Sequence, residues 1–400
     1  MRVKILIFLF IFLPFYLMAG YCDFCGSLIV DKKLCPYCKN SLQKDYSSKI
    51  SCPVCESINS SKNRYCTNCG YPLKFLNEEF KNAVIEFNKG NYKSSLNLLN
   101  KILKEDRFFY YAYEYKIEIL YKNGNLSNFY SEIKNRLRIE KDDLPTLFVM
   151  GLLYYKNGEK VNSISTFKDA LKIYPEFSEA YYELYKITGE FEYLKRAIEY
   201  KSSFYLPYIS YAEYFVKDKK YEDAKDYIDK AFKLFPYDYR IYYIKGRIKI
   251  EENDISKETL NFFKKSLEYN PGFIPAKYYI GKLYYLQNDI LKSLDTFKDI
   301  LTEKEVEQEI YMLSNFYIGL IYDRVNNFDL FNINLAESRN YLKYYEESFN
   351  NLSLIKDFIY ATTEEYDKIL LLRDLTEFYK NKVIDSNKYL EERRIAIFKK

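Results

Sequence analysis

From residue 76 onward the sequence repeats itself with a period of about 34 residues, and this period limits the fold more than any other feature. The clearest copy is 144–177, and further copies are 205–238 and 274–307. A chain of such short units buries its apolar residues only when each unit packs on its neighbours. In the clearest copy the recurring residues are Leu147, Met150, Gly151, Tyr154, Gly158, Ser163, Phe167, Ala170 and Pro175.

These residue types predict two antiparallel helices in each unit. Positions are counted from the first residue of each 34-residue unit, so that Leu144 is position 1 of the clearest copy. The residues at positions 4, 7, 11 and 24 are apolar and recur at helical spacing. The residues at positions 8, 20 and 27 are small, so that two helices can approach closely. Proline at position 32 ends the second helix. The short turn between the helices carries Gly158-Glu159, Lys219-Lys220 or Asn288-Asp289.

Weaker copies fill the gaps between the clear ones. The sequence predicts units at 76–109 and 110–143, a truncated unit at 178–204, and a unit at 239–273 with one extra residue. Another unit begins near residue 312 and diverges. Residues 349–400 keep helical periodicity without the repeat, which is typical of capping helices at the end of an array.

Period and residue types resemble the tetratricopeptide repeat (TPR). The resemblance covers residues 76–348 and implies an all-α solenoid of about six to eight helix–turn–helix units curved into a superhelix. It also implies a role in binding other proteins.

All eight cysteines lie in residues 22–70, and they form four Cys-x2-Cys pairs. Two such pairs supply the four thiolates of one tetrahedral site. Gly26 and Gly70 each follow the second cysteine of a pair, where a tight turn requires positive φ. The predicted metal ligands are Cys22, Cys25, Cys35, Cys38, Cys52, Cys55, Cys66 and Cys69. Spacing alone does not decide whether one site forms within residues 22–38 and the other within 52–69, or whether each site combines cysteines from both halves.

Residues 22–75 resemble a tandem zinc ribbon, which implies a small β-rich module and two structural Zn²⁺ ions. Such a module has too small an apolar core to fold alone, so metal would supply much of its folding free energy. Metal removal should therefore melt this front segment. Two alternatives stay open: disulfides in an oxidising compartment, and thiol–disulfide exchange.

Residues 1–21 combine Arg2 and Lys4 with an apolar run over residues 5–18 and the small pair Ala19-Gly20. This layout is typical of a secretory signal peptide. An uncleaved membrane anchor is the second interpretation, since the run falls short of the ~20 residues of a spanning helix. We expect location at the cell envelope, with the cytoplasmic face as the alternative.

The absence of certain residues excludes several kinds of chemistry. The chain has no histidine, so histidine-based triads and HExxH zinc sites are excluded. Neither of the common phosphate-binding loop motifs, GxGxxG and GxxxxGK[ST], occurs.

The charge is nearly balanced over most of the chain. Lys+Arg 61 against Asp+Glu 56 gives a net charge of +5. Residues 1–75 hold ten basic and four acidic side chains, which leaves 51 against 52 for the rest. The sequence therefore predicts a non-enzyme without an extended nucleic-acid surface on its repeats.

In the TPR family the first helix of each unit lines the concave face, so positions 5 and 12, about 100° round the helix from positions 4 and 11, should face a groove. An aromatic groove suits a peptide, although an aromatic stripe at helical spacing is more often core. The predicted groove residues are Phe148, Tyr155, Tyr182, Ile209, Tyr243, Tyr278 and Tyr285. The cations Arg240, Lys245, Arg247 and Lys249 lack a matching cation in another unit and are interpreted as a solvated face.

The leading hypothesis is a non-catalytic scaffold that binds proteins or peptides through its repeats, with zinc ribbons held by metal. The alternative is nucleic-acid binding by the ribbons with the repeats as an assembly arm, supported by eight basic against four acidic residues in 20–75. The partner and the oligomeric state are not readable from the sequence.

Overall fold

A computed structural model describes residues 19–30, 35, 37–38, 49–73, 75–307, 310–311, 313–315, 317–318 and 321. The signal or anchor segment up to residue 18, most of the repeat predicted near 312 and the predicted capping helices at 349–400 lie outside the described residues. The chain divides into two compact units, residues 1–208 and 209–400.

The cysteine-rich part forms two small antiparallel hairpins. β1 (Ala19–Tyr21) pairs with β2 (Leu28–Val30), with Tyr21 opposite Leu28, and β3 (Lys49–Ser51) pairs with β4 (Ile58–Ser60). The sequence assigned residues 19–21 to the N-terminal segment. In the structure they form a strand of the first hairpin, because their backbone pairs with β2.

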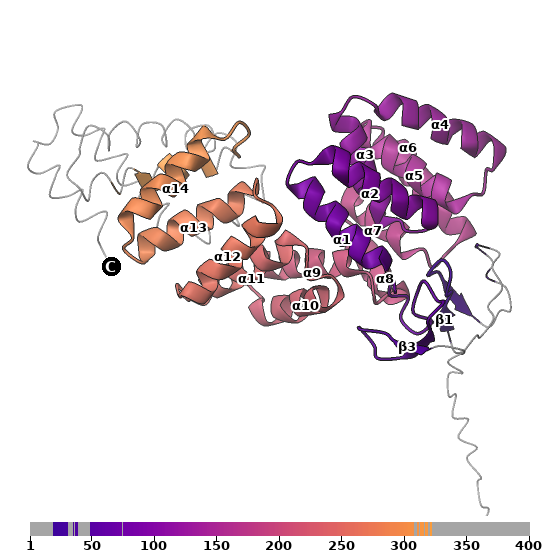
Figure 1. The fold of residues 1–400 in the computed structure, drawn as a ribbon, viewed down its shortest axis with the longest axis horizontal. Helices are drawn as coiled ribbons and strands as arrows, with labels where there is room; N and C mark the ends of the chain where they lie inside the picture. The colour runs from indigo at the N-terminus through magenta and orange to yellow at the C-terminus, as the bar shows by residue number, and fades with distance from the viewer. Residues whose placement is uncertain are drawn as a thin grey trace, which may run out of the picture. The chain divides into compact units, whose positions relative to one another are not determined.

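The remainder of the described chain is helical, and its helices come in seven successive pairs (Figure 1). The first four pairs are α1 (Phe75–Asn88) with α2 (Tyr92–Glu105), α3 (Tyr111–Lys122) with α4 (Leu126–Ile139), α5 (Leu144–Lys156) with α6 (Lys160–Ile173), and α7 (Ser178–Thr188) with α8 (Phe191–Tyr200). The others are α9 (Tyr205–Lys217) with α10 (Tyr221–Leu234), α11 (Tyr239–Glu251) with α12 (Lys257–Tyr269), and α13 (Ile274–Leu286) with α14 (Ile290–Thr302).

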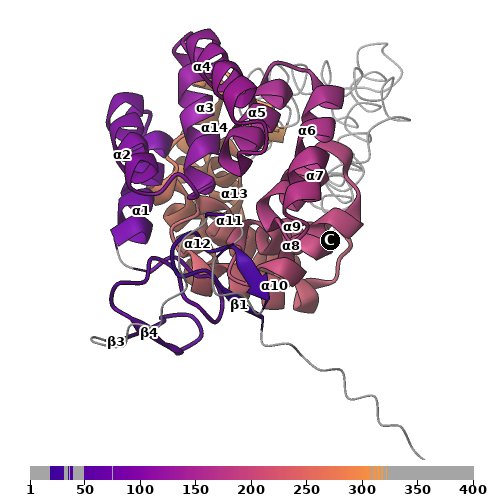
Figure 2. The same cartoon turned by 90° about the vertical axis from the view of Figure 1, so that its right-hand side faces the viewer.

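The pairs follow the predicted repeat boundaries. The truncated repeat at 178–204 has the two shortest helices, α7 and α8, and the extra residue of 239–273 lies in the longer turn between α11 and α12. In the first unit α1, α3, α5 and α7 also contact one another in succession, as Figure 2 shows, so that first helices form one row. This TPR-like arrangement confirms the predicted all-α stack.

Small residues let the two helices of a pair approach, as the sequence predicted. In the pair α5–α6, the hydroxyl of Ser163 donates a hydrogen bond to the carbonyl oxygen of Gly151 at 2.8 Å, and the Phe167 ring covers the same glycine. The pair α13–α14 repeats this contact: the Ser293 hydroxyl donates to the Gly281 carbonyl at 2.9 Å, beneath the Phe297 ring. Positions 8, 20 and 24 of the repeat therefore form one packing unit.

A larger residue at position 8 should force these helices apart. A Cβ atom at Gly281 would lie 2.9 Å from the ring of buried Phe297. We expect Gly281→Val to lower the free energy of unfolding by about 1–3 kcal/mol, the usual cost of overpacking a core. Thermal unfolding measures the change. Gly272→Val is the matched control, since the nearest atom to its Cβ would be 3.9 Å away; an equal loss in both variants would contradict this explanation.

The turns inside the repeats need a residue with positive φ. Gly158 supplies it with φ +83°, whereas Lys219 and Asn288 adopt φ of 57° and 65° at the same position. Helix starts are also specified locally: Asp143 caps α5 by accepting a hydrogen bond from the Thr146 amide.

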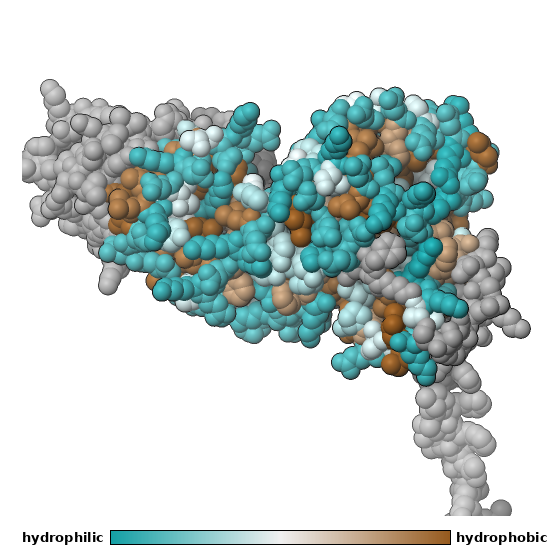
Figure 3. Space-filling view, in the orientation of Figure 1, coloured by the Kyte–Doolittle hydropathy of each residue, from teal (hydrophilic) through white to brown (hydrophobic). Residues whose placement is uncertain are grey.

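Each unit has its own apolar core, which gathers residues between Tyr110 and Leu184 in the first unit and between Leu260 and Ile321 in the second. On the face drawn in Figure 3, hydrophobic residues appear in separate small groups among hydrophilic ones. Within the described part of the chain, every helix is too short or too polar to span a bilayer.

Candidate metal centre

The eight cysteines form two clusters of four, and each cluster could hold a metal ion. Within each cluster all four sulfur atoms lie within 4.8 Å of one another. Each half of the module forms its own cluster, which decides the arrangement that spacing left open. The first cluster contains Cys22, Cys25, Cys35 and Cys38, and the second contains Cys52, Cys55, Cys66 and Cys69.

The local backbone explains how two cysteines of a pair come to face one site. In the pair Cys22–Cys25, the amide of Gly26 donates a hydrogen bond to the Cys22 carbonyl at 2.9 Å, and Gly26 has φ +70°. Gly70 repeats this turn after Cys69, and Glu56 adopts the same left-handed conformation after Cys55. The tight turn brings both sulfurs of a pair to the same side.

The sulfur–sulfur distances fit ligands around a common centre and are too long for disulfides. Cys22 and Cys38 are 3.7 Å apart, as are Cys25 and Cys35. In the second cluster Cys52 lies 3.7 Å from Cys69, and Cys55 lies 3.6 Å from Cys66. A disulfide would require about 2.05 Å. All eight cysteines are free thiols in the structure.

Polar groups surround the sulfurs of the second cluster. The Ser57 hydroxyl lies 3.0 Å from the sulfur of Cys55 and 3.1 Å from that of Cys66. The side-chain amide of Asn59 donates a hydrogen bond to the Cys66 sulfur at 3.4 Å. Hydrogen bonds from Cys69 and Ser57 lower the pKa of Cys66 below its ordinary value, which favours the thiolate that metals bind.

The two hairpins interlock through a repeated motif, Tyr-Cys-x-x-Cys-Gly, at residues 21–26 and 65–70. The Tyr65 ring lies over Gly26, where an added Cβ would be 2.7 Å away, and the Tyr21 ring lies over Gly70 at the same distance. Backbone bonds are reciprocal as well: the Tyr21 amide donates to the Thr67 carbonyl, and the Tyr65 amide to the Asp23 carbonyl. We call these reciprocal contacts of Tyr21 and Tyr65 the tyrosine clasp.

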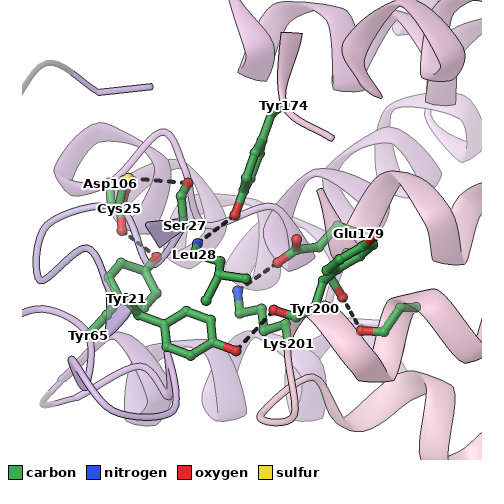
Figure 4. A network of polar contacts seen from close by, with 12 residues as sticks. Tyr21, Cys25, Ser27, Leu28, Tyr65, Asp106, Tyr174, Glu179, Tyr200 and Lys201 are labelled. Carbon is green, nitrogen blue, oxygen red and sulfur yellow. Dashed lines mark hydrogen bonds and ion pairs between the residues drawn. The ribbon is translucent and has the colours of Figure 1, made fainter. Parts of the chain in front are cut away.

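The same two tyrosines attach the hairpins to the helices (Figure 4). The Tyr21 hydroxyl donates a hydrogen bond to the carbonyl oxygen of Tyr200, the last residue of α8, at 2.9 Å. The Tyr65 hydroxyl donates to Oδ2 of Asp106, the residue that follows α2, at 2.6 Å. The cysteine module therefore shares polar contacts with the C-terminal ends of α2 and α8.

A buried ion pair lies beside the clasp, also drawn in Figure 4. The Lys201 ammonium is 2.7 Å from Oε1 of Glu179, and both side chains are less than a tenth exposed. Lys201 also lies 5.8 Å from the centre of the Tyr65 ring. Burial raises the pKa of Tyr21 to about 12, so its hydroxyl stays protonated and remains a donor.

The cysteines of this site were predictable from the sequence, whereas its docking contacts were not. The sequence pattern indicated an attached module at residues 22–75 and a leader segment that included Tyr21. The repeated Tyr-Cys-x-x-Cys-Gly motif was a visible sign that the two pairs have equivalent surroundings. Nothing in the sequence indicated which helix ends their hydroxyls contact.

The predicted groove residues separate by their position in the repeat. At position 5, Phe148, Tyr182, Ile209 and Tyr278 are buried and Tyr243 is half-buried; at position 12, Tyr285 is half-buried and Tyr155 is 39% exposed. Position 5 is therefore core where the expectation was an open groove, because rings from neighbouring helices cover it, as Phe167 and Phe177 cover Phe148. A partner-binding role for the seven residues stays a prediction.

Three charged side chains meet in the first unit, on α3 and α7. The Lys186 ammonium lies 2.8 Å from Oε2 of Glu114 and 2.7 Å from Oε1 of Glu183. Burial, followed by the charge of Glu114, raises the pKa of Glu183 to about 8. One lysine thus faces two carboxylates, and the more buried of them holds its proton to higher pH.

This shift makes stability depend on pH. The folded pKa of Glu183 exceeds its unfolded value of about 4.3, so its contribution is complete below that value and is lost as pH rises toward 8. We expect the free energy of unfolding to fall over this range, and Glu183→Gln to remove that fall. Urea titrations at several pH values measure it, with Glu192→Gln as the exposed control. An unchanged pH slope in Glu183→Gln would contradict the assignment.

Comparisons with known proteins agree with the fold. No family model matches the chain. A curated relative, DnaJ homolog subfamily C member 3 of Gallus gallus, is 21% identical over 239 residues, which is 59% of this chain and 44% of the relative. In the crystal structure of the APC/C hetero-tetramer Cut9–Hcn1, a chain matches with a TM-score of 0.52 and 17% identity, over 65% of this chain and 52% of that chain. The chain thus spans about half, or less, of the length of these two proteins, and the likeness shows a TPR-like fold.

Proposed function

We propose that this chain is a non-catalytic scaffold that binds partner proteins through its TPR-like helices, with two structural Zn²⁺ ions in its cysteine module. The observation that carries the proposal is the joining of the two parts in the first unit. The tyrosine clasp and its hydrogen bonds to Asp106 and to Tyr200 hold the cysteine module against the helix ends. Such an arrangement presents one fixed surface made of both parts.

Zinc fits the geometry of the clusters. Four sulfurs at about 2.3 Å from a tetrahedral Zn²⁺ have edges of about 3.8 Å, close to the four distances of 3.6–3.7 Å. Four thiolates fill the coordination shell, so the ion would cross-link the chain and have no open position for a substrate. The cysteines, Ser57 and Asn59 would hold the ions, and zinc would supply folding free energy that the small hairpins lack.

Protein binding is supported by the architecture. Stacked helix pairs expose long rows of side chains, which is how repeat arrays form extended binding surfaces. The structurally similar chain belongs to the hetero-tetramer of Cut9 and Hcn1. We propose a protein or peptide as the partner on residues 75–302.

The location we propose is the cell envelope. Its support is the basic start and apolar run of residues 1–18. Because Tyr21 belongs to the clasp, we expect any cleavage of this segment to fall before Tyr21. Mass spectrometry of the purified chain measures the N-terminus.

Cross-linking in intact source cells tests the function. A tagged full-length chain is cross-linked, purified, and digested for mass spectrometry, with fractionation of the envelope beforehand. We expect reproducible cross-links from another protein to α1–α14. Cross-links that map only to the cysteine module, together with RNA or DNA binding that weakens steeply with salt, would overturn the proposal in favour of a nucleic-acid-binding module.

A further inference from the structure

A cavity of about 400 Å³ lies where the cysteine module meets α2, α3 and α4. Its wall on the module side is made by Phe24 and Arg64. Phe24 stands between two ligands of the first cluster, Cys22 and Cys25. The wall on the module side is therefore complete only when the module is folded and docked on the helices.

Two of the lining cations are already engaged. The Arg64 guanidinium donates to the backbone carbonyl of Glu105 at 2.7 Å and lies 4.2 Å from the centre of the Phe24 ring. Arg107 forms an ion pair with Asp143. These contacts fix the walls of the cavity.

Two other lining cations, Lys116 of α3 and Arg136 of α4, have no carboxylate within ion-pair distance among the described residues. Lys116 lies 4.6 Å from the centre of the Phe129 ring. The acidic side chain that faces it is Glu132, and burial lowers the pKa of Lys116 despite that neighbour. A half-buried ammonium loses part of its hydration, and no carboxylate of the described residues pairs with this one at ion-pair distance. A bound anion would replace the lost hydrogen bonds.

Aromatic rings complete the walls. They come from Phe24, Phe108, Tyr113 and Phe129. Rings beside unpaired cations suit a ligand with a carboxylate next to an apolar side chain, and the volume is at the lower end of the range for ligand pockets.

We infer that this cavity binds an acidic segment of a partner protein, with a carboxylate on Lys116 and Arg136 and an apolar side chain against the rings. The inference rests on the proposed function and names the chemistry of the partner. A peptide fits better than a nucleic acid, because Glu105 and Glu132 also line the cavity and would repel a run of phosphates. After residue 75 basic and acidic side chains are nearly balanced, 51 against 52, whereas binding of a polyphosphate backbone depends on a surplus of basic side chains.

The test is fluorescence anisotropy on the full metal-loaded chain. The probe is a fluorescein-labelled ten-residue peptide with one glutamate beside a phenylalanine among uncharged residues, compared with the same peptide in which glutamine replaces the glutamate. We expect the acidic peptide to bind and the glutamine peptide to bind at least about tenfold more weakly, since a lost charge-assisted hydrogen bond costs about that factor.

Variants locate the binding. The double variant Lys116→Gln/Arg136→Gln should weaken acidic-peptide binding about tenfold or more. Arg138→Gln, on α4 outside the cavity lining, should change it less than about twofold. Thermal unfolding checks that each variant folds; if the double variant is destabilised, Arg136→Gln alone is used, because Arg136 is exposed.

Any of three binding results would overturn the inference: equal binding of both peptides, unchanged binding in the double variant, or displacement of the acidic peptide by a ten-nucleotide RNA at lower concentration. A partner that cross-links equally to the wild type and the double variant would also contradict it, while the proposed scaffold function would stand. Absence of any cross-linked partner would count against the scaffold function, and the peptide measurement remains independent of that outcome.

Discussion

Removing the metal with a strong chelator is expected to unfold residues 19–73 and to loosen the ends of α2 and α8. Structural zinc sites contribute about 10–16 kcal/mol to the folding of small zinc-finger peptides, so the hairpins should not persist without the ions. When they unfold, Asp106 loses the Tyr65 hydroxyl and Tyr200 loses the Tyr21 hydroxyl. Because these docking contacts are lost, chelation should also affect the ends of α2 and α8, whereas the sequence alone predicted melting of the front segment only.

Hydrogen–deuterium exchange measured by mass spectrometry resolves this result along the chain. We expect protection near residues 102–109 and 197–204 to fall about tenfold, which corresponds to the loss of one buried hydrogen bond and its packing. The helices α13 and α14 of the second unit are the internal control and should keep their protection. Loss of exchange protection confined to residues 19–73 would contradict the proposed coupling.

Replacing Lys201 with methionine is expected to destabilise the first unit by about 3–5 kcal/mol, because Glu179 would keep a buried charge without a partner. Both side chains of the pair are less than a tenth exposed, and their charged atoms are 2.7 Å apart. Replacing both residues, in Lys201→Met/Glu179→Leu, should recover most of the loss, since no unpaired charge remains. Urea unfolding of the three proteins measures the coupling.

An exposed ion pair provides the matched control. Lys172 lies 2.8 Å from Asp169 with side chains 77% and 51% exposed, so Lys172→Met should cost about 0–1 kcal/mol. A similar small loss in Lys201→Met would show that the buried pair does not stabilise the docked module. A double variant as unstable as the single one would show that lysine packing matters and its charge does not.

Much of the helical part could be predicted because each repeat specifies its own packing. Gly151, Ser163 and Phe167 contact one another in the structure, and their order in the sequence already indicated two close antiparallel helices. The shortened repeat at 178–204 and the extra residue in 239–273 were visible in the same way. The spacing of residues within one repeat is sufficient to predict the helix pairs, because each pair contacts mainly its neighbours in the sequence.

The docking of the cysteine module could not be predicted, because its partners are distant in the sequence. Tyr21 contacts Tyr200, 179 residues later, and no periodic pattern connects them. The cysteine clusters themselves were predictable from spacing, whereas their membership within each half needed three-dimensional information.

Most of the residues predicted to line an open groove are buried in the structure, and the reason is physical. Counting positions round one helix placed Phe148 and Tyr278 on a free face, but the ring of Phe177, which directly precedes α7, covers Phe148, and the ring of Tyr317 covers Tyr278. At position 12, Tyr155 is exposed, whereas Tyr285 is half-buried against the Tyr317 ring.

The metal and thiol content of the full chain, purified from its source cells without added metal, tests the account most directly. Elemental analysis and thiol titration of the same sample give both quantities. We expect two zinc ions per chain and eight reduced cysteines, the number that the two clusters contain. Four disulfides and no zinc would contradict the account, because disulfide-bonded sulfurs cannot form the two four-sulfur sites.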